Sequence, residues 1–356
     1  MRRFLLKFAV VALPFIVIAL FVMHYDTFNI FHWQNIRFTS AEPNKNFIKT
    51  QYIIHNPKKF NAFIFGSSRV GYIPLDSLPK ETAGSPLHWY NMTYASGIPA
   101  DHLGTIQTFL KNGVSIDMIL LAFDNISMCT SSEQQKKSLI RMPFQVYEES
   151  PFRFYEPYLK NKPALSIIRE VNSYNATEKK AETERFYEWG GFAIDFLLTE
   201  NPQIERYVSA HGSAPFSQKD AYKDIEAIAA LCRENGIALV LFTNPIYETT
   251  YRDTVENGYF DFMRSVAGVT EFYNFSALNN YTINQQYYFE SSHYRPALGL
   301  LVNKVLFGTK EDRERICHDA GDQMWGTRVS MQNVEQVIAH LQRQLSESGN
   351  FIYNNF

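Results

Sequence analysis

Two serines follow an apolar run in the stretch AFIFGSSRVGY, which begins at Ala62. The run from Ala62 to Gly66 predicts a buried strand that ends at Ser67 and Ser68. In an open parallel sheet, ligands bind outside the carboxyl ends of the strands, where a serine nucleophile would lie. Glycine and serine also end strands in ordinary turns, so this stretch alone leaves both interpretations open.

A nucleophilic serine needs a base within hydrogen-bond reach and a third group that orients the base. In the stretch YYFESSHYRPALG, Glu290 lies three residues before His293 and just ahead of a predicted helix. One short turn brings a carboxylate at this spacing to the far nitrogen of the imidazole, and His293 then faces Ser68. The alternative is a structural histidine that caps the helix or lies in the core.

Further polar residues follow other predicted strands at the same edge of the sheet. They belong to the stretches YASGIP (94–99), FDN (123–125) and TNP (243–245). Asp124 and Asn125 suit a strand-end turn as well as a binding role, because Asx residues favour such turns. Arg69, next to Ser68, either forms a structural ion pair or binds an anionic polymer as a substrate-binding residue.

In their order along the chain, these segments resemble the SGNH hydrolase superfamily over most of residues 60–308. The closest resemblance is to its membrane-anchored acyltransferase branch, which includes the D-alanine transfer protein of teichoic acids and related polysaccharide O-acyltransferases. The resemblance implies Ser68 as the nucleophile and His293 as the general base. It implies Glu290 as the orienting acid, at a position where the family usually has aspartate.

The resemblance also implies two oxyanion donors. Gly97 matches the glycine of the second conserved block, whose backbone N–H binds the oxyanion. Asn125 would offer its side-chain amide, although the stretch AFDN lacks the glycine of the family's third block and reverses its final Asn-Asp pair. An oxyanion donor of this kind is worth about 3 kcal/mol of transition-state stabilisation.

Apolar strands alternate with amphipathic helices along the chain. This alternation predicts an α/β fold with a parallel sheet and helices on both faces. The resemblance specifies this as an SGNH-like or flavodoxin-like three-layer sandwich. Strands are expected at 62–66, 88–95, 117–125, 237–245 and 269–276, and helices at 100–113, 219–236, 251–268, 295–308 and 331–348.

The N-terminus has the pattern of a membrane anchor. Arg2, Arg3 and Lys7 precede an apolar run that extends from Phe8 to Met23. The segment from Phe4 is about long enough to cross a bilayer, with Lys7 reaching back to the interface. Basic residues on this side predict a cytoplasmic N-terminus and place the remaining chain outside the cytoplasm, in a bacterial periplasm or at the cell surface.

These patterns divide the chain into an anchor, a connecting segment, a catalytic domain and a tail. The α/β domain is interrupted by aromatic-rich residues that we expect to form an insertion over the carboxyl edge of the sheet. The predicted divisions are 1–23 for the cytoplasmic tip and transmembrane anchor, 24–60 for a juxtamembrane stalk, 61–308 for the α/β domain with its insertion at 130–216, and 309–356 for a C-terminal helical tail.

The composition excludes several classes of function. With 34 Lys and Arg against 36 Asp and Glu, and no basic stripe, the chain is not expected to bind nucleic acid. Its nine histidines are scattered and form no H-x-x-x-H pair, so neither a metal nor another cofactor is expected.

Two functions remain. The first is an extracytoplasmic acyl-serine enzyme, an O-acyltransferase or esterase that acts on a cell-envelope polysaccharide or teichoic-type polymer. The anchor favours transfer over hydrolysis, because it would hold the domain beside a membrane enzyme that exports the acyl group. By resemblance, that partner is a membrane-bound O-acyltransferase. The second is a non-catalytic SGNH-like scaffold that positions a membrane partner's substrate.

Overall fold

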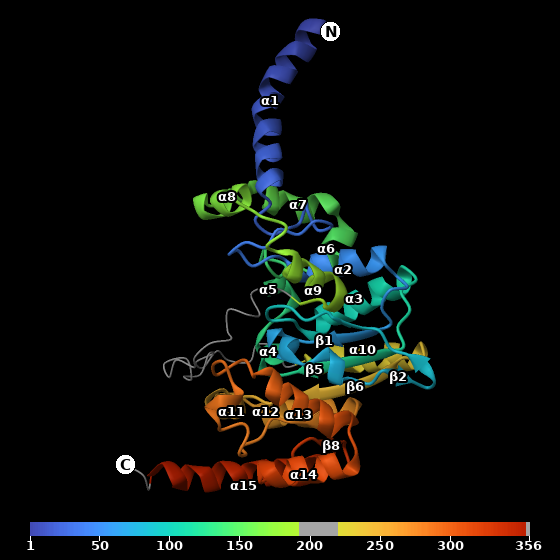
Figure 1. Ribbon diagram of the computed structural model, residues 1–356, viewed down its shortest axis with the longest axis vertical. Helices are drawn as coiled ribbons and strands as arrows, with labels where there is room; N and C mark the ends of the chain where they lie inside the picture. The colour runs from blue at the N-terminus through green and yellow to red at the C-terminus, as the bar shows by residue number, and fades with distance from the viewer. Residues whose placement is uncertain (192–219, 354–356) are drawn as a thin grey trace.

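The structure is a computed structural model that describes residues 1–191 and 220–353. It has an α/β fold in which helices flank a six-stranded, mostly parallel sheet (Figure 1). The strands of this sheet are β1 (Ala62–Phe65), β4 (Trp89–Asn91), β5 (Met118–Phe123), β6 (Ala238–Thr243), β7 (Phe272–Asn274) and β8 (Thr327–Val329). A small separate ribbon pairs β2 (Glu81–Thr82) with β3 (Ser85–Pro86).

The strand order is β4-β1-β5-β6-β7-β8. The first five strands of this order run parallel, and β8 pairs antiparallel with β7. Numbered along the chain, the five parallel strands have the order 2-1-3-4-5, as in flavodoxin-like folds. The strand order reverses between β1 and β5, and ligands of such sheets bind at this point, outside the carboxyl ends of the strands. The segments that begin with Ser67 and Asp124 follow these two strands.

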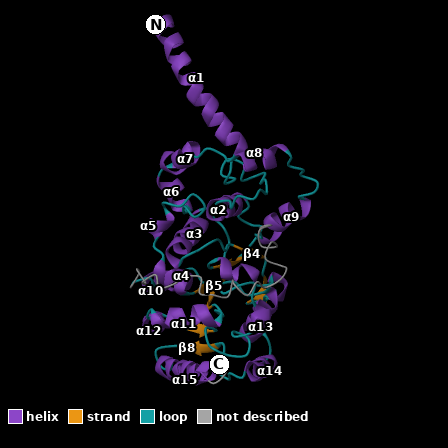
Figure 2. Ribbon diagram, turned by 90° about the vertical axis from the view of Figure 1, so that its left-hand side faces the viewer, coloured by secondary structure: helices purple, strands orange, loops and turns teal. Residues whose placement is uncertain are grey.

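Helices cover both faces of the sheet. Figure 2 shows α10 and α12 on one side of the strands and α13 on the other. The helices are α1 (Arg2–Tyr25), α2 (Lys45–His55), α3 (Pro99–Lys111), α4 (Asn125–Cys129), α5 (Ser132–Gln135), α6 (Phe144–Glu149), α7 (Pro151–Lys160), α8 (Leu165–Asn172), α9 (Lys180–Trp189), α10 (Tyr222–Glu234), α11 (Glu248–Glu256), α12 (Tyr259–Val269), α13 (Pro296–Phe307), α14 (Lys310–Ala320) and α15 (Val334–Tyr353), with 3₁₀ turns η1 (Ser68–Tyr72), η2 (Leu75–Ser77) and η5 (Gln285–Tyr287).

The central strands are buried along their whole length. Every residue of β1 and β5 is buried, which is the pattern of parallel strands covered on both faces. Their side chains belong to the main hydrophobic core, together with apolar residues of α3, α10, α12 and α13. Burial on both faces therefore holds rigidly the two strands whose carboxyl ends carry the candidate residues.

Residues 24–60 differ from the predicted stalk, because most of them pack into the fold. Helix α2 is buried over most of its length, and Phe47 and Ile48 have no exposed surface. These side chains form a second hydrophobic core with Phe144, Phe154 and Phe186, which come from the predicted insertion. The segment buries its aromatic and aliphatic side chains against the insertion, so it is part of the folded body.

The described part of the insertion packs against helices α1, α2 and α3 and, through α9, against β4, the edge strand of the sheet. Helix α9 contacts β4, and α6 contacts α2 and α3. Helix α5 reaches the carboxyl edge of the sheet, where the side-chain amide of Gln135 donates to the carbonyl of Ser96. Residues 192–216 of the predicted insertion lie outside the described residues.

Helix α1 projects from the body at the end occupied by α7 and α8 (Figure 1). It ends at Tyr25, and the next residue, Asp26, has a left-handed backbone conformation with φ of 36°. The Asp26 carboxylate accepts the backbone N–H groups of Ile30, Phe31 and His32 at 2.9, 2.7 and 2.8 Å. Among the residues that the structure describes, no helix combines the length and the apolar character needed to cross a membrane.

Candidate active site

The stretch after β1 turns sharply at Gly66 and enters the short helix η1. Gly66 has φ of +149°, and a side chain there would approach the carbonyl oxygen of Ala122 to 3.1 Å. The hydroxyl of Ser67 caps η1 by accepting the N–H of Arg69 at 3.4 Å. Ser68 is the first residue of η1, so this turn presents it at the carboxyl edge of β1.

Ser68, His293 and Glu290 form one chain of hydrogen bonds. The Nε2 atom of His293 lies 2.8 Å from Oγ of Ser68. The Nδ1 atom of His293 contacts Oε1 of Glu290. Ser68 and His293 are 225 residues apart in the sequence, so the sheet brings them together. The three side chains have the contacts of a nucleophile, a base and the acid that orients the base.

A tight turn holds Glu290 and His293 on the same side. The N–H of Phe289 donates to the carbonyl of His293 at 2.9 Å, and Tyr288 and Tyr294 form an isolated antiparallel bridge around the turn. The N–H of Ser292 donates to Oε2 of Glu290 at 2.8 Å. The carboxylate therefore has one oxygen fixed by the backbone and the other directed at the imidazole.

The carboxyl group of Glu290 is held in its ionised form. Burial raises its pKa, but the hydrogen bonds from His293 and the Ser292 N–H, with the nearby charge of Arg69, lower the pKa more. The net pKa lies below the ordinary value for glutamate. An ionised Glu290 can fix the imidazole tautomer and stabilise the imidazolium that forms when His293 takes a proton.

A buried polar network lies directly behind the serine turn, centred on Asp124. The carboxylate of Asp124 is 1% exposed as a residue and accepts from Oγ of Ser67 and Nδ2 of Asn244, both at 3.0 Å. It also accepts the N–H of Ile126 at 2.8 Å, which caps α4. Asp124 therefore links the ends of β1, β5 and β6. Ser67 is occupied in this network, which distinguishes it from Ser68.

Arg69 is buried in the same network and does not line an open site. It is 2% exposed, and its Nη1 lies 3.3 Å from Oδ2 of Asp124. The same nitrogen donates to Oδ1 of Asn125. A side chain with so little exposed surface has no room to bind a polymer, so the structure does not support the predicted substrate-binding role. Arg69 forms a structural ion pair with Asp124 beside the serine turn.

The predicted oxyanion donors have different outcomes. The side-chain oxygen Oδ1 of Asn125 accepts from Arg69, so the side-chain nitrogen Nδ2 keeps both of its hydrogens for another acceptor. Nδ2 has no hydrogen-bond partner among the described residues. The N–H of Gly97 donates to the carbonyl of Tyr94 at 3.1 Å, so this conformation does not offer it to an oxyanion. A further donor, which residue type does not reveal, is the backbone N–H of Ser68; it has no intrahelical partner because Ser68 begins η1.

Gly97 has a packing role instead. A side chain at this position would approach the carbonyl oxygen of Gly66 to 2.5 Å and Cε1 of His102 to 2.9 Å. Distances this short to backbone and to a packed ring require the neighbours to move. Glycine is therefore needed here because the loop after β4 crosses closely over the end of β1.

Two titratable groups lie buried in the first turn of α3, next to this crossing. Burial raises the pKa of Asp101 to about 7, although the hydroxyl groups of Ser132 and Tyr94 donate to it at 2.8 and 3.4 Å. Burial lowers the pKa of His102 to about 3, and its ring packs against those of Phe65 and Tyr94. Both groups therefore favour their neutral forms in the folded protein.

Opposite pH effects on stability follow from these two shifts. The stabilising contribution of Asp101 is complete below its unfolded pKa of 3.8 and is lost as pH rises through about 7. That of His102 is complete above its unfolded pKa of 6.5 and is lost as pH falls towards about 3. Between about pH 4 and 6 the two contributions oppose each other, so their combined slope is shallow.

Single substitutions should expose each slope. Relative to the unmodified chain, Asp101→Asn should make the free energy of unfolding rise with pH by up to about 1 kcal/mol per unit between about pH 4 and 6. His102→Leu should give the reverse slope. Urea unfolding across this range measures both. Parallel curves for the unmodified chain and both variants would show that neither group titrates with a shifted pKa.

Comparison with known proteins adds no family to these findings. Neither the scan against protein-family models nor the search of curated proteins finds a match for this chain.

Among the described residues, no group of three or more His, Cys, Asp or Glu side chains is arranged to hold a metal ion.

Proposed function

We propose that this chain is a serine-dependent acyltransferase or esterase of the SGNH type. The observation that carries the proposal is the hydrogen-bonded chain from Glu290 through His293 to Ser68. Its position supports the same function, because β1 and β5 meet at the point of the sheet where the strand order reverses. Both features come from side chains and strands of the described residues.

The proposed reaction has two steps. Oγ of Ser68 attacks the carbonyl carbon of an ester, and its proton passes to Nε2 of His293. The tetrahedral intermediate collapses, the ester C–O bond breaks and the alcohol leaves with the proton from His293. A hydroxyl group of the acceptor then attacks the acyl-serine and gives its proton to His293. The new ester leaves, and Ser68 regains its proton. With water in place of the acceptor, the same steps hydrolyse the ester.

The negative charge of each tetrahedral intermediate would be stabilised by two N–H donors. These are the backbone N–H of Ser68 and the side-chain amide of Asn125, which Arg69 orients through the amide oxygen. Removing one donor of this kind typically lowers kcat by about a hundredfold to a thousandfold. The ionised Glu290 would stabilise the imidazolium of His293 in both steps.

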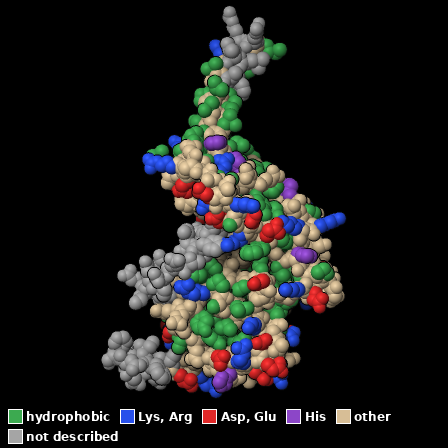
Figure 3. Space-filling view, viewed as in Figure 1, with side chains coloured by type: hydrophobic (Ala, Val, Ile, Leu, Met, Phe, Trp, Pro, Cys, Tyr) green, Lys and Arg blue, Asp and Glu red, His purple; other side chains and the backbone are tan. Residues whose placement is uncertain are grey.

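The setting of the reaction belongs to the same proposal. The N-terminal segment near residues 4–23 acts as a single-pass anchor with a cytoplasmic tip, and the α/β domain lies outside the cytoplasm. Apolar side chains cover the described part of the projecting helix α1 (Figure 3), and those of Phe15 and Leu20 are exposed, which supports this setting. The acceptor is a cell-envelope polysaccharide or teichoic-type polymer, and a membrane-bound O-acyltransferase exports the acyl group.

A serine-directed fluorophosphonate tests the proposal on the full chain. We expect covalent labelling that Ser68→Ala abolishes, because the probe needs the serine that His293 activates. Ser67→Ala is the matched control and should retain most of the label, since its hydroxyl donates to Asp124 and has no contact with the base. Loss of label in Ser67→Ala alone would place the nucleophile one residue earlier. A folded chain that never labels would favour the non-catalytic scaffold.

A further inference from the structure

A large cavity extends from Tyr72, whose ring lies next to that of His293, towards β4 and α9. It has a volume of about 1040 Å³, at the upper end of the usual range for small-molecule sites. Tyr72 forms its boundary with the active site. The ring of Tyr72 lies 6.0 Å from that of His293 and 5.0 Å from that of Phe289, which also lines the cavity. We call this cavity the groove.

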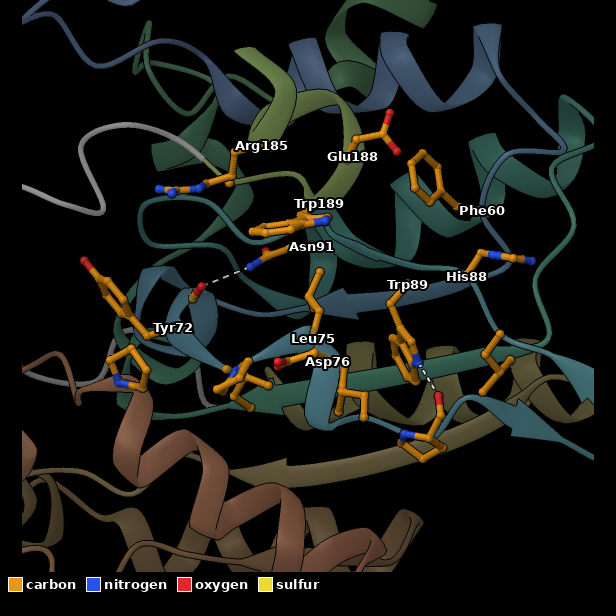
Figure 4. A pocket seen from close by; sticks show the side chains of 18 of the residues that line it. Phe60, Tyr72, Leu75, Asp76, His88, Trp89, Asn91, Arg185, Glu188 and Trp189 are labelled. Atoms are coloured by element: carbon orange, nitrogen blue, oxygen red, sulfur yellow. Dashed lines mark hydrogen bonds between the residues drawn. The ribbon is translucent and has the colours of Figure 1, made fainter. Parts of the chain in front are cut away.

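Apolar side chains form most of the groove. They come from η2, the residues on either side of the β2–β3 ribbon, β4 and α9, and Figure 4 shows Leu75, Trp89 and Trp189 around the same space. Trp189 is 57% exposed as a residue, and an exposed aromatic side chain within an apolar concave surface is typical of a binding site. The main apolar lining residues are Ile73, Leu75, Leu78, Leu87, Trp89 and Trp189.

Two polar groups beside the apolar wall of the groove, on Asn91 and Trp89, already have partners. The amide of Asn91 donates to the carbonyl of Gly71 at 3.1 Å, and its oxygen accepts from Thr93. The indole N–H of Trp89 donates to the carbonyl of Pro79 at 2.7 Å. Figure 4 shows the bonds to Gly71 and Pro79 as dashed lines. These groups cannot replace the water that a sugar ring would lose, whereas a hydrocarbon chain needs no such replacement.

One charged side chain that lines the groove, Lys59, also has its partners within the protein. Nζ of Lys59 lies 2.7 Å from the carboxylate of Glu188 and also donates to the hydroxyl of Tyr52 and the carbonyl of Tyr187. Lys59 therefore uses its three donors within the protein. This leaves the apolar walls as the dominant surface for a ligand on the side of α9.

We infer that the groove binds the hydrocarbon chain of the acyl group that Ser68 transfers. This inference rests on the proposed function, because the groove relates to catalysis only through Tyr72, which lines it and lies next to His293. The ester carbonyl would lie at Ser68, and the chain would pass Tyr72 and Phe289 to reach Leu75 and Trp189. The substrate is then an ester with an acyl group much longer than acetyl.

The test compares p-nitrophenyl acetate with p-nitrophenyl octanoate. The full chain is placed in lipid nanodiscs, because the alkyl chains of detergents would compete for the groove. We expect kcat/KM for octanoate to exceed that for acetate by about a hundredfold, since each buried methylene adds to binding. Equal values for the two esters, with both reactions lost in Ser68→Ala, would overturn the groove inference and leave the serine function standing.

Two substitutions in the groove sharpen this comparison. Trp189→Ala removes apolar surface, and Ala297→Trp fills space from an exposed lining position. Each should lower kcat/KM for octanoate about tenfold and leave that for acetate within about twofold. Phe152→Ala is the control, because Phe152 is 75% exposed on α7 and does not line the groove. Equal losses for both esters would contradict a role confined to the acyl chain.

A binding measurement separates this inference from catalysis. Octanoate is titrated into the Ser68→Ala chain while tryptophan fluorescence is recorded. A saturable change that Trp189→Ala removes would support the groove, even in a chain that hydrolyses neither ester and so fails the proposed function. No change with octanoate, together with a saturable change on adding maltopentaose, would show that the groove takes sugar rings and would overturn the inference.

Discussion

Replacing Ser68 with alanine should lower kcat for p-nitrophenyl ester hydrolysis by about four to six orders of magnitude. His293→Ala should lower it to a similar degree, because in the proposed mechanism His293 Nε2, 2.8 Å from the hydroxyl, takes the serine proton. The double variant should be no slower than either single variant, since residues that act as a unit do not have additive effects. Steady-state kinetics on the full chain measures all three.

The acid gives a graded control for this prediction. Glu290→Gln should cost less than His293→Ala, because the imidazole keeps its contact with Ser68 but loses the charge that stabilises its protonated form. Glu290→Asp should retain much of the activity, as it keeps the charge. Near-normal rates in His293→Ala would end the catalytic interpretation, and the serine turn would then be a structural strand ending.

Substituting Arg69 with leucine should lower the free energy of unfolding by about 3–5 kcal/mol. The change leaves Asp124 charged and buried, because Arg69 lies 3.3 Å from it and both side chains are almost completely enclosed. Urea unfolding measures this loss. Adding Asp124→Asn should recover much of it, since an uncharged asparagine can still accept hydrogen bonds from Ser67 and Asn244.

The matched control is Arg264, whose Nε lies 2.7 Å from Glu335 on the exposed surface. Arg264→Leu should cost less than about 1 kcal/mol, because solvent screens an exposed ion pair. Similar losses for the two arginine variants would contradict a special role for the buried pair.

The sequence was most informative where burial determines the pattern. Continuous apolar runs predicted β1, β5 and β6 within two residues at each end, because parallel strands covered on both faces carry few polar residues. The predicted helix at 251–268 is interrupted in the structure. Helix α11 ends at Glu256 and α12 begins at Tyr259, because Gly258 between them has φ of +96°.

Long-range packing was harder to predict. Residues 24–60 were expected as a stalk because they are polar and aromatic, yet Phe47 lies in a core built with residues about a hundred positions later. No local periodicity records a partner so distant in sequence. The antiparallel strand β8 was missed for a related reason, since three residues pairing with β7 carry too short a pattern to recognise.

In the candidate site, too, local spacing was predictable and the packing between distant loops was not. The contacts of Ser68 with His293 and of His293 with Glu290 agree with the spacing argument, since Glu-x-x-His fits one tight turn. Arg69 and Gly97 could not be assigned from residue type alone. Their roles depend on which neighbour takes the hydrogen bond, and this depends on how the loops after β1, β4 and β5 cross.

The capped junction at Asp26 has a consequence for the proposed activity at a membrane. Three backbone N–H groups donate to Asp26, and α1 packs against α7 and α8. The helix is therefore joined to the body without a flexible linker. With the proposed anchor in place, Ser68 would remain at a nearly constant height above the bilayer. Only acceptor groups that reach this height would be acylated. The length of α1 and its fixed junction would therefore determine which positions along an envelope polymer are modified.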